Sequence, residues 1–335
     1  KPGVIVLACE LIDHNGEELL RIMNQYVSDW GWEDEFAQWM ANDCTICTTL
    51  VDTIVPGRIR DPKEAAAVAE RLGYEDPFLA VREPFQMWGI QGDESLKERL
   101  PFVKAGLPGV FVTPDVTPYK KRKVRILNGA HTAFVPGSWV AGFDIVRDCM
   151  HDETVRGFMN TMLYDEVIPT LAADLDVEDC KAFAAAVENR FDNPFIDHAL
   201  LSICLNSTAK WRARDLPTLK DYVAETGNLP KCLATSLATL IAFYTQELVS
   251  REGDGLHLRR ADGTEYTAQD DAFVLDFYAA HAGAEDAELV HEVLTNEQMW
   301  GEDLTQIAGL EEFVVKALAV VRAEGVKQAF ANAQA

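Results

Sequence analysis

The sequence predicts an α/β region followed by a mostly α-helical domain. Short β-branched apolar runs alternate with helical patterns up to Thr113, which is the order expected of strands connected by helices. After Thr117 almost every segment shows helical periodicity instead. With 335 residues the chain is long enough for two domains, and we place the boundary near Asp115, between regions 1–115 and 116–335.

Strands are predicted at four places in the first region: residues 4–9, 48–55, 85–91 and 109–113. The first of them is an uninterrupted apolar run, a pattern typical of a parallel strand that is buried on both faces. The second is stopped by Pro56, which cannot donate a hydrogen bond to a neighbouring strand.

Two helices are expected between these strands. One begins at Asn15, which together with Glu18 predicts a capping box, and runs to about residue 30. The other, at 62–72, is expected to begin after Asp61 as its N-cap and to end at Gly73.

The second region is predicted to be helical in nine segments: 119–133, 152–173, 177–190, 195–212, 217–225, 231–249, 268–281, 284–293 and 309–325. The exception is 256–266, where a tight-turn signal at 261–264 separates two short extended arms. The Ala- and Gln-rich tail after Gly325 is expected to fray.

The composition excludes some classes of protein. The net charge of -24 repels a phosphate backbone, so nucleic acid is not an expected partner. The longest apolar run, at 233–244, is too short for the roughly 20 residues that cross a bilayer, so no membrane partner is expected. The apolar run at 4–8 is too short for a signal peptide.

The seven cysteines lack the regular spacing of a disulfide framework, which indicates reduced thiols and a cytoplasmic protein. Cys44 and Cys47 form the only CxxC pair, and no second pair completes a tetrahedral zinc site. We therefore interpret these cysteines as structural and expect no metal.

One basic stretch stands out in this acidic chain. Five of the six residues at 120–125 are cationic, and Asn128 and His131 follow. In an α-helix, at about 100° per residue, Asn128 lies about 140° and His131 about 80° around from Lys123, so the three side chains share one broad face. An amine, a carboxamide and an imidazole on one face can transfer a proton and polarise a carbonyl group. The alternative is a solvated helix face with a semi-buried structural histidine.

Further candidates are Asp52, at the end of a predicted strand, and the cationic side chains of Arg190, Lys210, Arg212 and Arg214. In an acidic protein, two separated cationic clusters can focus a small anion into a cleft between domains. Such a site suits a carboxylated substrate. The alternative for the cluster at Lys210 is an exposed helix end, where the helix dipole favours cations.

The same residues resemble a known family. Lys123-x4-Asn128-x2-His131 is similar to the signature of the polyol-specific long-chain dehydrogenases, the mannitol dehydrogenase family. Other segments resemble the family in the expected order: 51–54 (VDTI), 190–194 (RFDNP) and 300–307 (WGEDLTQI). Segments 8–16 and 118–123 resemble the branch of the family that acts on uronates.

The resemblance implies an NAD-dependent interconversion of a keto sugar acid, tagaturonate, and its alcohol, altronate, without zinc. It implies that Lys123 is the general acid for ketone reduction and the general base in reverse. Because a lysine with a pKa near 10.4 is a poor base at neutral pH, this role requires burial or nearby cations to lower the pKa.

It further implies that Asn128 donates a hydrogen bond to the developing alkoxide and that His131 holds a substrate oxygen. Asp52 and Arg190 match family segments near the cleft, and Lys210 is a looser candidate for binding the substrate carboxylate. The implied fold is the later part of a Rossmann-like nucleotide-binding domain at 1–115, followed by a helical substrate domain at 116–335.

Two departures from the family pattern bear on this prediction. Ala8-Cys-Glu-Leu11 stands where mannitol-type members carry Ser-Cys-Asp-Asn, which favours a uronate over mannitol. No GxGxxG or GxxxxGK[ST] motif occurs, so the glycine-rich phosphate loop is absent. Either the chain is a fragment of a longer protein, or the protein does not bind NAD alone. Three alternatives remain: reduction of fructuronate, oxidation of mannitol, and a truncated non-catalytic helical binding or interaction protein. The oligomeric state is not predicted.

Overall fold

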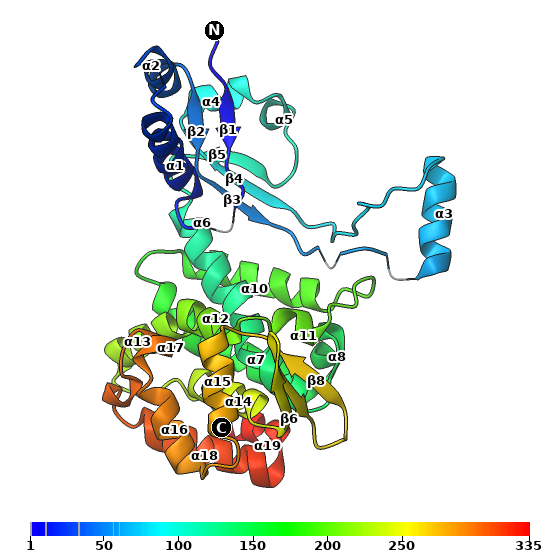
Figure 1. Ribbon diagram of the computed structural model, residues 1–335, viewed down its shortest axis with the longest axis vertical. Helices are drawn as coiled ribbons and strands as arrows, with labels where there is room; N and C mark the ends of the chain where they lie inside the picture. Colours follow the sequence, from blue (N-terminus) through cyan, green and yellow to red (C-terminus); the bar gives the residue numbers. More distant parts are fainter. Residues whose placement is uncertain (1, 11, 33, 56, 60) are drawn as a thin grey trace. The chain divides into compact units, whose positions relative to one another are not determined.

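The computed structural model describes residues 2–10, 12–32, 34–55, 57–59 and 61–335 (Figure 1). The chain divides into two compact units, Lys1–Lys121 and Arg122–Ala335. Two predictions, the departure from the family pattern at Leu11 and the strand stop at Pro56, fall outside the described residues.

The first unit contains two small sheets. β1 (Ile5–Leu7) pairs in parallel with β2 (Thr45–Cys47). In the other sheet β4 (Met87–Gln91) lies between β3 (Thr49–Asp52), which is antiparallel to it, and β5 (Val110–Thr113), which is parallel. All four predicted strands are therefore present, but β1 is only half-buried, so its predicted burial on both faces is wrong. β2 was not predicted.

The helices described in this unit are α1 (Asn15–Asp29), α2 (Asp34–Asn42), α3 (Pro62–Leu72), α4 (Glu94–Arg99) and α5 (Pro101–Lys104). A small apolar core unites the strands with α4, and its buried members are Cys47, Ile90, Leu96, Leu100 and Val112. The core is small because most of the residues of α1 and α3 face solvent.

The start of α1 differs from the predicted capping box. The residue before the helix is His14, which has a left-handed φ of 51° and makes no side-chain cap bond. Asn15 is buried, and its carboxamide donates to the carbonyls of Glu10 and Thr49, each at 3.0 Å, while the Thr49 N–H donates to Asn15 Oδ1. Asn15 therefore fastens the helix to β3. The capping prediction is wrong because a tertiary contact satisfies this side chain better than its own helix end.

The termini of α3 agree with the prediction. Asp61 accepts a hydrogen bond of 2.9 Å from the Lys63 N–H, Pro62 occupies the first turn, and Gly73 closes the helix with a φ of 79°. These short-range signals depend only on neighbouring residues, which is why the sequence predicted them correctly.

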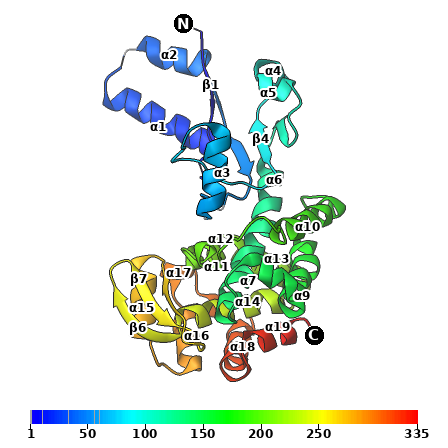
Figure 2. The same ribbon diagram turned by 90° about the vertical axis from the view of Figure 1, so that its right-hand side faces the viewer.

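The second unit is mostly helical. It begins with the turn of π-helix η1 (Lys123–Asn128) and α7 (Gly129–Val140), which continue the helical run of α6 (Thr117–Arg122). α7 packs against α14 (Lys231–Tyr244), and α14 also contacts α18 (Leu310–Glu324) (Figure 2). α7 is buried from Gly129 to Trp139 and α14 from Cys232 to Tyr244, so these two helices form the centre of the core.

The remaining elements of this unit surround that pair. They are α8 (Val146–His151), α9 (Glu153–Thr161), the π-helix η2 (Met162–Val167), η3 (Pro169–Leu171), α10 (Val177–Phe191), α11 (Leu200–Ile203), α12 (Ser207–Arg214), α13 (Leu216–Thr226), α15 (Ala272–Ala280), α16 (Asp286–Leu294), α17 (Glu297–Trp300), η4 (Leu304–Gln306) and α19 (Val326–Ala333).

Two helix predictions in this unit are corrected. The helix expected at 195–212 is a loop followed by α11 and α12, because Pro194 and the pairing of Ala199 with Ile145 keep the chain extended. The helix expected at 231–249 ends at Tyr244. The chain then forms β6 (Glu247–Glu252), which extends the predicted hairpin of β7 (Gly255–Arg259) and β8 (Glu265–Ala268) to three antiparallel strands.

The tail does not fray. It forms α19, in which Phe330 is fully buried and stacks on Phe158 at 3.9 Å between ring centroids. This long-range contact, rather than the composition of the tail, decides its structure.

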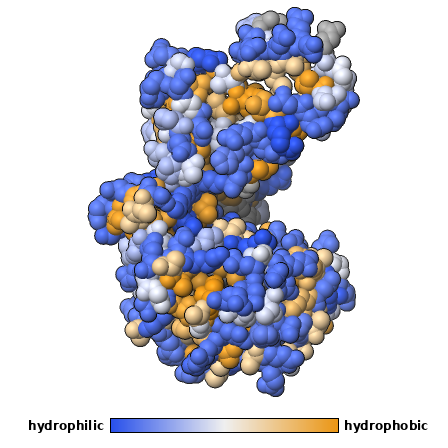
Figure 3. All heavy atoms as spheres, turned by 90° about the vertical axis from the view of Figure 1, so that its left-hand side faces the viewer, coloured by the Kyte–Doolittle hydropathy of each residue, from blue (hydrophilic) through white to orange (hydrophobic). Residues whose placement is uncertain are grey.

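One face of the molecule is mostly hydrophilic (Figure 3). Hydrophilic residues cover most of the face seen in Figure 3, and hydrophobic residues gather in a few places. Among the described residues, the most exposed large hydrophobic side chains are Phe78, at 87%, and Phe195, at 89%.

Candidate active site

The Lys123 to His131 stretch is helical, but its first part is wound as a π-helix. Lys123 and Asn128 are the first and last residues of η1, both are half-buried, and His131 lies in the first turn of α7. The rotation of 100° per residue assumed from the sequence therefore does not apply here, because π-helical hydrogen bonds join residues five apart. Such turns occur frequently at functional sites.

His131 is buried, with 6% of its surface exposed. Its ring stacks on Phe191 at 4.0 Å and meets the ring of His198 edge-on at 5.4 Å. Among the described residues, Nε2 of His131 has no hydrogen-bond partner. Burial, followed by the nearby charges of His198 and Arg214, lowers the pKa of His131 well below its usual value, so its imidazole is neutral at neutral pH.

Three cationic side chains act on this neutral ring. Arg190 at the end of α10 is buried, and Lys210 and Arg214 stand one turn apart on α12. The charges of Arg214, Arg190 and Lys210 all contribute to the lowered pKa of His131. Burial, and then Arg214, lowers the pKa of Lys210, whose Nζ donates to the Ile203 carbonyl at 2.9 Å. The structure thus gathers positive charge at His131.

Arg214 also fixes the end of the π-helix. Its guanidinium Nη1 donates to Thr132 Oγ1 at 3.0 Å and to the Asn128 carbonyl at 3.5 Å. The Thr132 hydroxyl donates to the same carbonyl at 3.0 Å. α12 therefore holds the backbone of Asn128 from outside the helix.

A buried carboxyl lies behind this turn and was not predicted. Asp215 is 2% exposed, and a Cβ added to Gly129 would lie 2.9 Å from its Oδ1, so Asp215 packs directly on the helix backbone. Burial raises the pKa of Asp215 well above its usual value, while Arg214 and Arg125 oppose the shift. No sequence signal separates this aspartate from the many exposed ones.

The basic run before the site is not a freely solvated face. Three of its cations are paired with carboxylates on other elements: Lys120 with Asp13, Arg122 with Asp179 and Arg125 with Asp221. Much of the local positive charge is thus matched by structural partners.

Two further predicted residues are Arg212 and Asp52. Arg212 is exposed on the opposite side of α12 from Arg214, and its guanidinium lies beside Gly301. Asp52 belongs to the first unit, where it is buried at the end of β3.

Sequence reasoning missed Phe191 and His198, the two rings that touch His131. Both belong to the segment that begins with Arg190, and His198 follows the Asn193-Pro194 turn. The available signal for His198 was its position four residues after the family segment 190–194.

The cysteines and helices bear on the predictions that no metal and no membrane are bound. Cys44 and Cys47 are free thiols. No group of three or more His, Cys, Asp or Glu residues in the described part of the chain is arranged to hold a metal ion. No helix of that part is both long and apolar enough to cross a membrane.

Comparison with known families gives two matches that together cover most of the chain. Residues 115–322 match the mannitol dehydrogenase C-terminal domain, and residues 1–104 match the mannitol dehydrogenase Rossmann domain.

Curated relatives with similar sequences include altronate oxidoreductases. The enzyme of Yersinia enterocolitica is 41% identical over 335 residues, covering 98% of this chain and 66% of the relative. That of Klebsiella pneumoniae strain 342 is 42% identical over 333 residues, covering 98% of this chain and 65% of the relative. The chain thus spans slightly less than two thirds of the length of these relatives.

Two solved structures share the fold. Pseudomonas fluorescens mannitol 2-dehydrogenase, in a ternary complex with NAD and D-mannitol, has a TM-score of 0.73 and 21% identity, covering 99% of this chain and 62% of that one. A substrate-free D-sorbitol dehydrogenase has a TM-score of 0.77 and 20% identity, and the match covers 97% of this chain and 62% of that one.

Proposed function

Because the chain belongs to the mannitol dehydrogenase family, we propose that it contributes the substrate-binding and proton-transfer residues of an NAD-dependent oxidoreductase that interconverts tagaturonate and altronate. The identity of about 41% to altronate oxidoreductases supports this substrate pair over mannitol. The domains are proposed as 1–115 for the nucleotide-binding part and 116–335 for the substrate part.

One observation carries the choice of an acidic substrate: a buried, neutral imidazole lies within the field of three cations. Arg190, Lys210 and Arg214 all act on His131, which lacks a protein hydrogen-bond partner at Nε2 among the described residues. A carboxylate is stabilised by such a field, whereas an uncharged polyol gains little from it. We therefore assign Arg190 and Lys210 to the substrate carboxylate and His131 to a neighbouring substrate oxygen.

The proton transfer is assigned to the π-helical turn. In the reductive direction Lys123 gives a proton to the ketone oxygen, and in the oxidative direction it takes the proton from the hydroxyl group. The carboxamide of Asn128 donates a hydrogen bond to the same oxygen as negative charge develops on it. Arg214 supports this arrangement because it holds the Asn128 carbonyl. Asp52, at the end of β3, stays a predicted substrate-binding residue.

NAD is proposed as the hydride donor and acceptor because of the family. The described residues fit it only in part. The close packing of α1 on β2, where a Cβ on Gly16 would lie 2.4 Å from Thr48 N, is typical of a βα unit in a nucleotide-binding sheet. No glycine-rich phosphate loop is present in this sequence, so we derive no step of the reaction from contacts to the nucleotide.

The proposed location is the cytoplasm, and the proposed partner is a small sugar acid. All seven cysteines are free, which suits a reducing compartment.

The test of the function is NADH oxidation by the protein with tagaturonate, fructuronate and fructose. We expect tagaturonate to have the highest kcat/KM. A preference for fructose over both uronates would contradict the acidic substrate, and the absence of turnover or NADH binding would favour a non-catalytic binding protein.

The assignment of Lys123 is tested by Lys123→Ala. We expect kcat to fall by about 10²–10⁴-fold, the usual contribution of a general acid or base. The control is Lys181→Ala, which removes an exposed lysine paired with Glu178 and should leave kcat unchanged. Full activity of Lys123→Ala would overturn the mechanism.

A further inference from the structure

Two rings at the ends of a short loop contact His131. The loop covers residues 192–199, between the end of α10 at Phe191 and the start of α11 at Leu200. Phe191 precedes the loop and stacks on His131, and His198 lies near its end and meets His131 edge-on. The conformation of the loop therefore determines what surrounds His131 on two sides.

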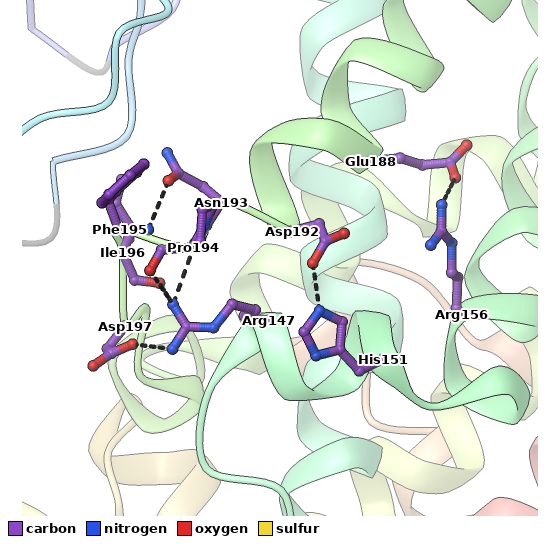
Figure 4. Close-up of polar contacts among 10 residues, drawn as sticks. All are labelled: Arg147, His151, Arg156, Glu188, Asp192, Asn193, Pro194, Phe195, Ile196 and Asp197. Atoms are coloured by element: carbon purple, nitrogen blue, oxygen red, sulfur yellow. Dashed lines mark hydrogen bonds and ion pairs between the residues drawn. The ribbon is translucent and has the colours of Figure 1, made fainter.

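The loop has little regular structure of its own, and α8 holds it from outside (Figure 4). Arg147 and His151 stand four residues apart on α8 and so share one face of the helix. The His151 ring lies 2.7 Å from the Asp192 carboxylate at the start of the loop. Arg147 reaches the rest of it.

The guanidinium of Arg147 contacts four acceptors. Its Nη1 donates to the Pro194 carbonyl at 2.9 Å and, more weakly, to the carbonyls of Asn193 at 3.4 Å and Ile196 at 3.5 Å. Its Nη2 donates to the Asp197 carboxylate at 2.6 Å. Only a planar, multi-donor cation can serve so many acceptors at once, and a lysine ammonium cannot reproduce this geometry.

Backbone pairing beside α8 fixes the end of the loop. The Val146 N–H donates to the His198 carbonyl at 3.0 Å, and the Leu200 N–H donates to the Asp144 carbonyl at 2.9 Å. The backbone of His198 is thereby anchored to Val146, the residue that precedes Arg147 on α8. The side chain of Phe195 is 89% exposed, whereas that of its neighbour Ile196 is buried, with 7% of its surface exposed.

We propose that Arg147 is a positioning residue that holds the 192–199 loop against α8, keeps His198 and Phe191 in place beside His131, and so sets the affinity for the sugar acid. The second half of this inference rests on the proposed function. Arg147 acts through the loop rather than on the substrate, and Lys123, on a different element, keeps its position when Arg147 is lost. Substrate binding is therefore affected more than proton transfer.

The experiment compares Arg147→Ala and Arg147→Lys with Arg156→Ala. Arg156 is the matched control because it pairs, at 3.2 Å, with Glu188 within α10 rather than with a residue of the loop (Figure 4). Hydrogen–deuterium exchange of residues 192–199 and steady-state kinetics with tagaturonate and NADH are measured for each variant.

In Arg147→Ala we expect faster exchange in the loop and an increase in KM of about tenfold or more, the effect of losing a charge-assisted hydrogen bond, with a smaller decrease in kcat. Arg147→Lys should be intermediate, and Arg156→Ala should match the wild type in both measurements. An unchanged exchange rate and KM in Arg147→Ala, or equal effects in Arg156→Ala, would overturn the proposal.

The exchange measurement needs no substrate, which separates the two proposals. If the wild-type protein reduces no sugar acid, the proposed function and the effect on affinity both fail. Loop exchange then still shows whether Arg147 holds the loop.

Discussion

At the scale of single residues, burial decides the protonation state at the candidate site. His131 is surrounded by aromatic rings and cations, and both effects oppose a positive charge on its imidazole. A neutral ring can accept a hydrogen bond at one nitrogen and donate at the other, which suits contact with a sugar hydroxyl or carbonyl oxygen.

His131 should make stability depend on pH. Its pKa in the folded state lies well below the value of 6.5 expected in the unfolded chain, so below about pH 6.5 the unfolded chain binds a proton that the folded state does not. Stability attributable to this residue is therefore lost as pH falls through that range. His131→Phe keeps a ring to stack on Phe191 but does not titrate, and it should gain stability relative to the wild type on acidification.

The measurement is the urea midpoint of both proteins between pH 5 and pH 8. The difference between the two urea midpoints should be constant above about pH 7. Below that pH the midpoint of His131→Phe should rise relative to that of the wild type. Parallel curves over the whole range would contradict the lowered pKa.

The sequence pointed to charged residues around His131 but not to their surroundings. Arg190 and Lys210 were suggested by charge and motif, and their charges do act on His131. His198 and Asp215 were missed, because their importance arises from contacts between α7 and distant segments. Arg212 carries the same charge as Arg214 but lies on the other side of α12, a distinction that charge counting cannot make.

At the scale of elements, two π-helical turns lie beside the central helices. η2 carries Glu166, whose carboxylate accepts hydrogen bonds from the N–H groups of Cys232 at 2.7 Å and Leu233 at 2.9 Å. These are the first N–H groups of α14, which have no partner within their own helix. A side chain from another element thus caps the helix on which α7 packs.

Glu166 should oppose His131 in its effect on pH dependence. Burial raises the pKa of Glu166 from 4.5 to about 7, so between these values the folded state holds a proton that the unfolded chain releases. Stability is therefore lost as pH rises through this window, by about 3 kcal/mol for this residue if the whole shift is expressed. Glu166→Gln does not titrate and should lose less stability than the wild type over the same range.

Urea unfolding of both proteins at pH 5 and pH 8 tests this, with Glu178→Gln on the exposed face of α10 as the surface control. At pH 5 Glu166→Gln is also expected to have a lower free energy of unfolding than the wild type, because one amide oxygen accepts the two backbone N–H groups less well than a carboxyl group does. The same pH dependence in Glu166→Gln and in the wild type would contradict the raised pKa.

Element prediction succeeded where the signal is local. The termini of α3 depend on Asp61 and Gly73 alone and were correct. Long-range contacts decided three other features. A contact with β3 sets the role of Asn15, the pairing of β6 with β7 follows the early end of α14, and Phe158 orders the tail. The π-helical winding of η1 leaves no mark on the hydrophobic pattern, so the sequence could predict a helix there but not its pitch.

At the scale of the whole molecule, the two units differ in the size of their cores. The first unit has a small cluster of buried apolar residues around Ile90, whereas the second is built on α7 and α14, which are buried along nearly their whole length. All the residues assigned here to the substrate carboxylate and to proton transfer belong to the second unit, and Asp52 belongs to the first.

The difference in core size predicts two unfolding transitions. The first unit should unfold at the lower urea concentration, because apolar burial is the main source of stability. Trp139, Trp211 and Trp300 are buried in the second unit, whereas Trp30 and Trp32 of the first are exposed. The main shift in tryptophan emission should therefore accompany the second transition, while circular dichroism should report both.

Altronate should move the second transition selectively, because the cations at His131 lie in that unit. At a concentration of about 100 times Kd the expected stabilisation is about 2.7 kcal/mol. Mannitol, which has no carboxylate, serves as the matched control and should shift neither transition at the same concentration. A single transition seen equally by both probes would contradict the independence of the units, and a shift of the first transition alone would place the acid-binding residues in the wrong unit.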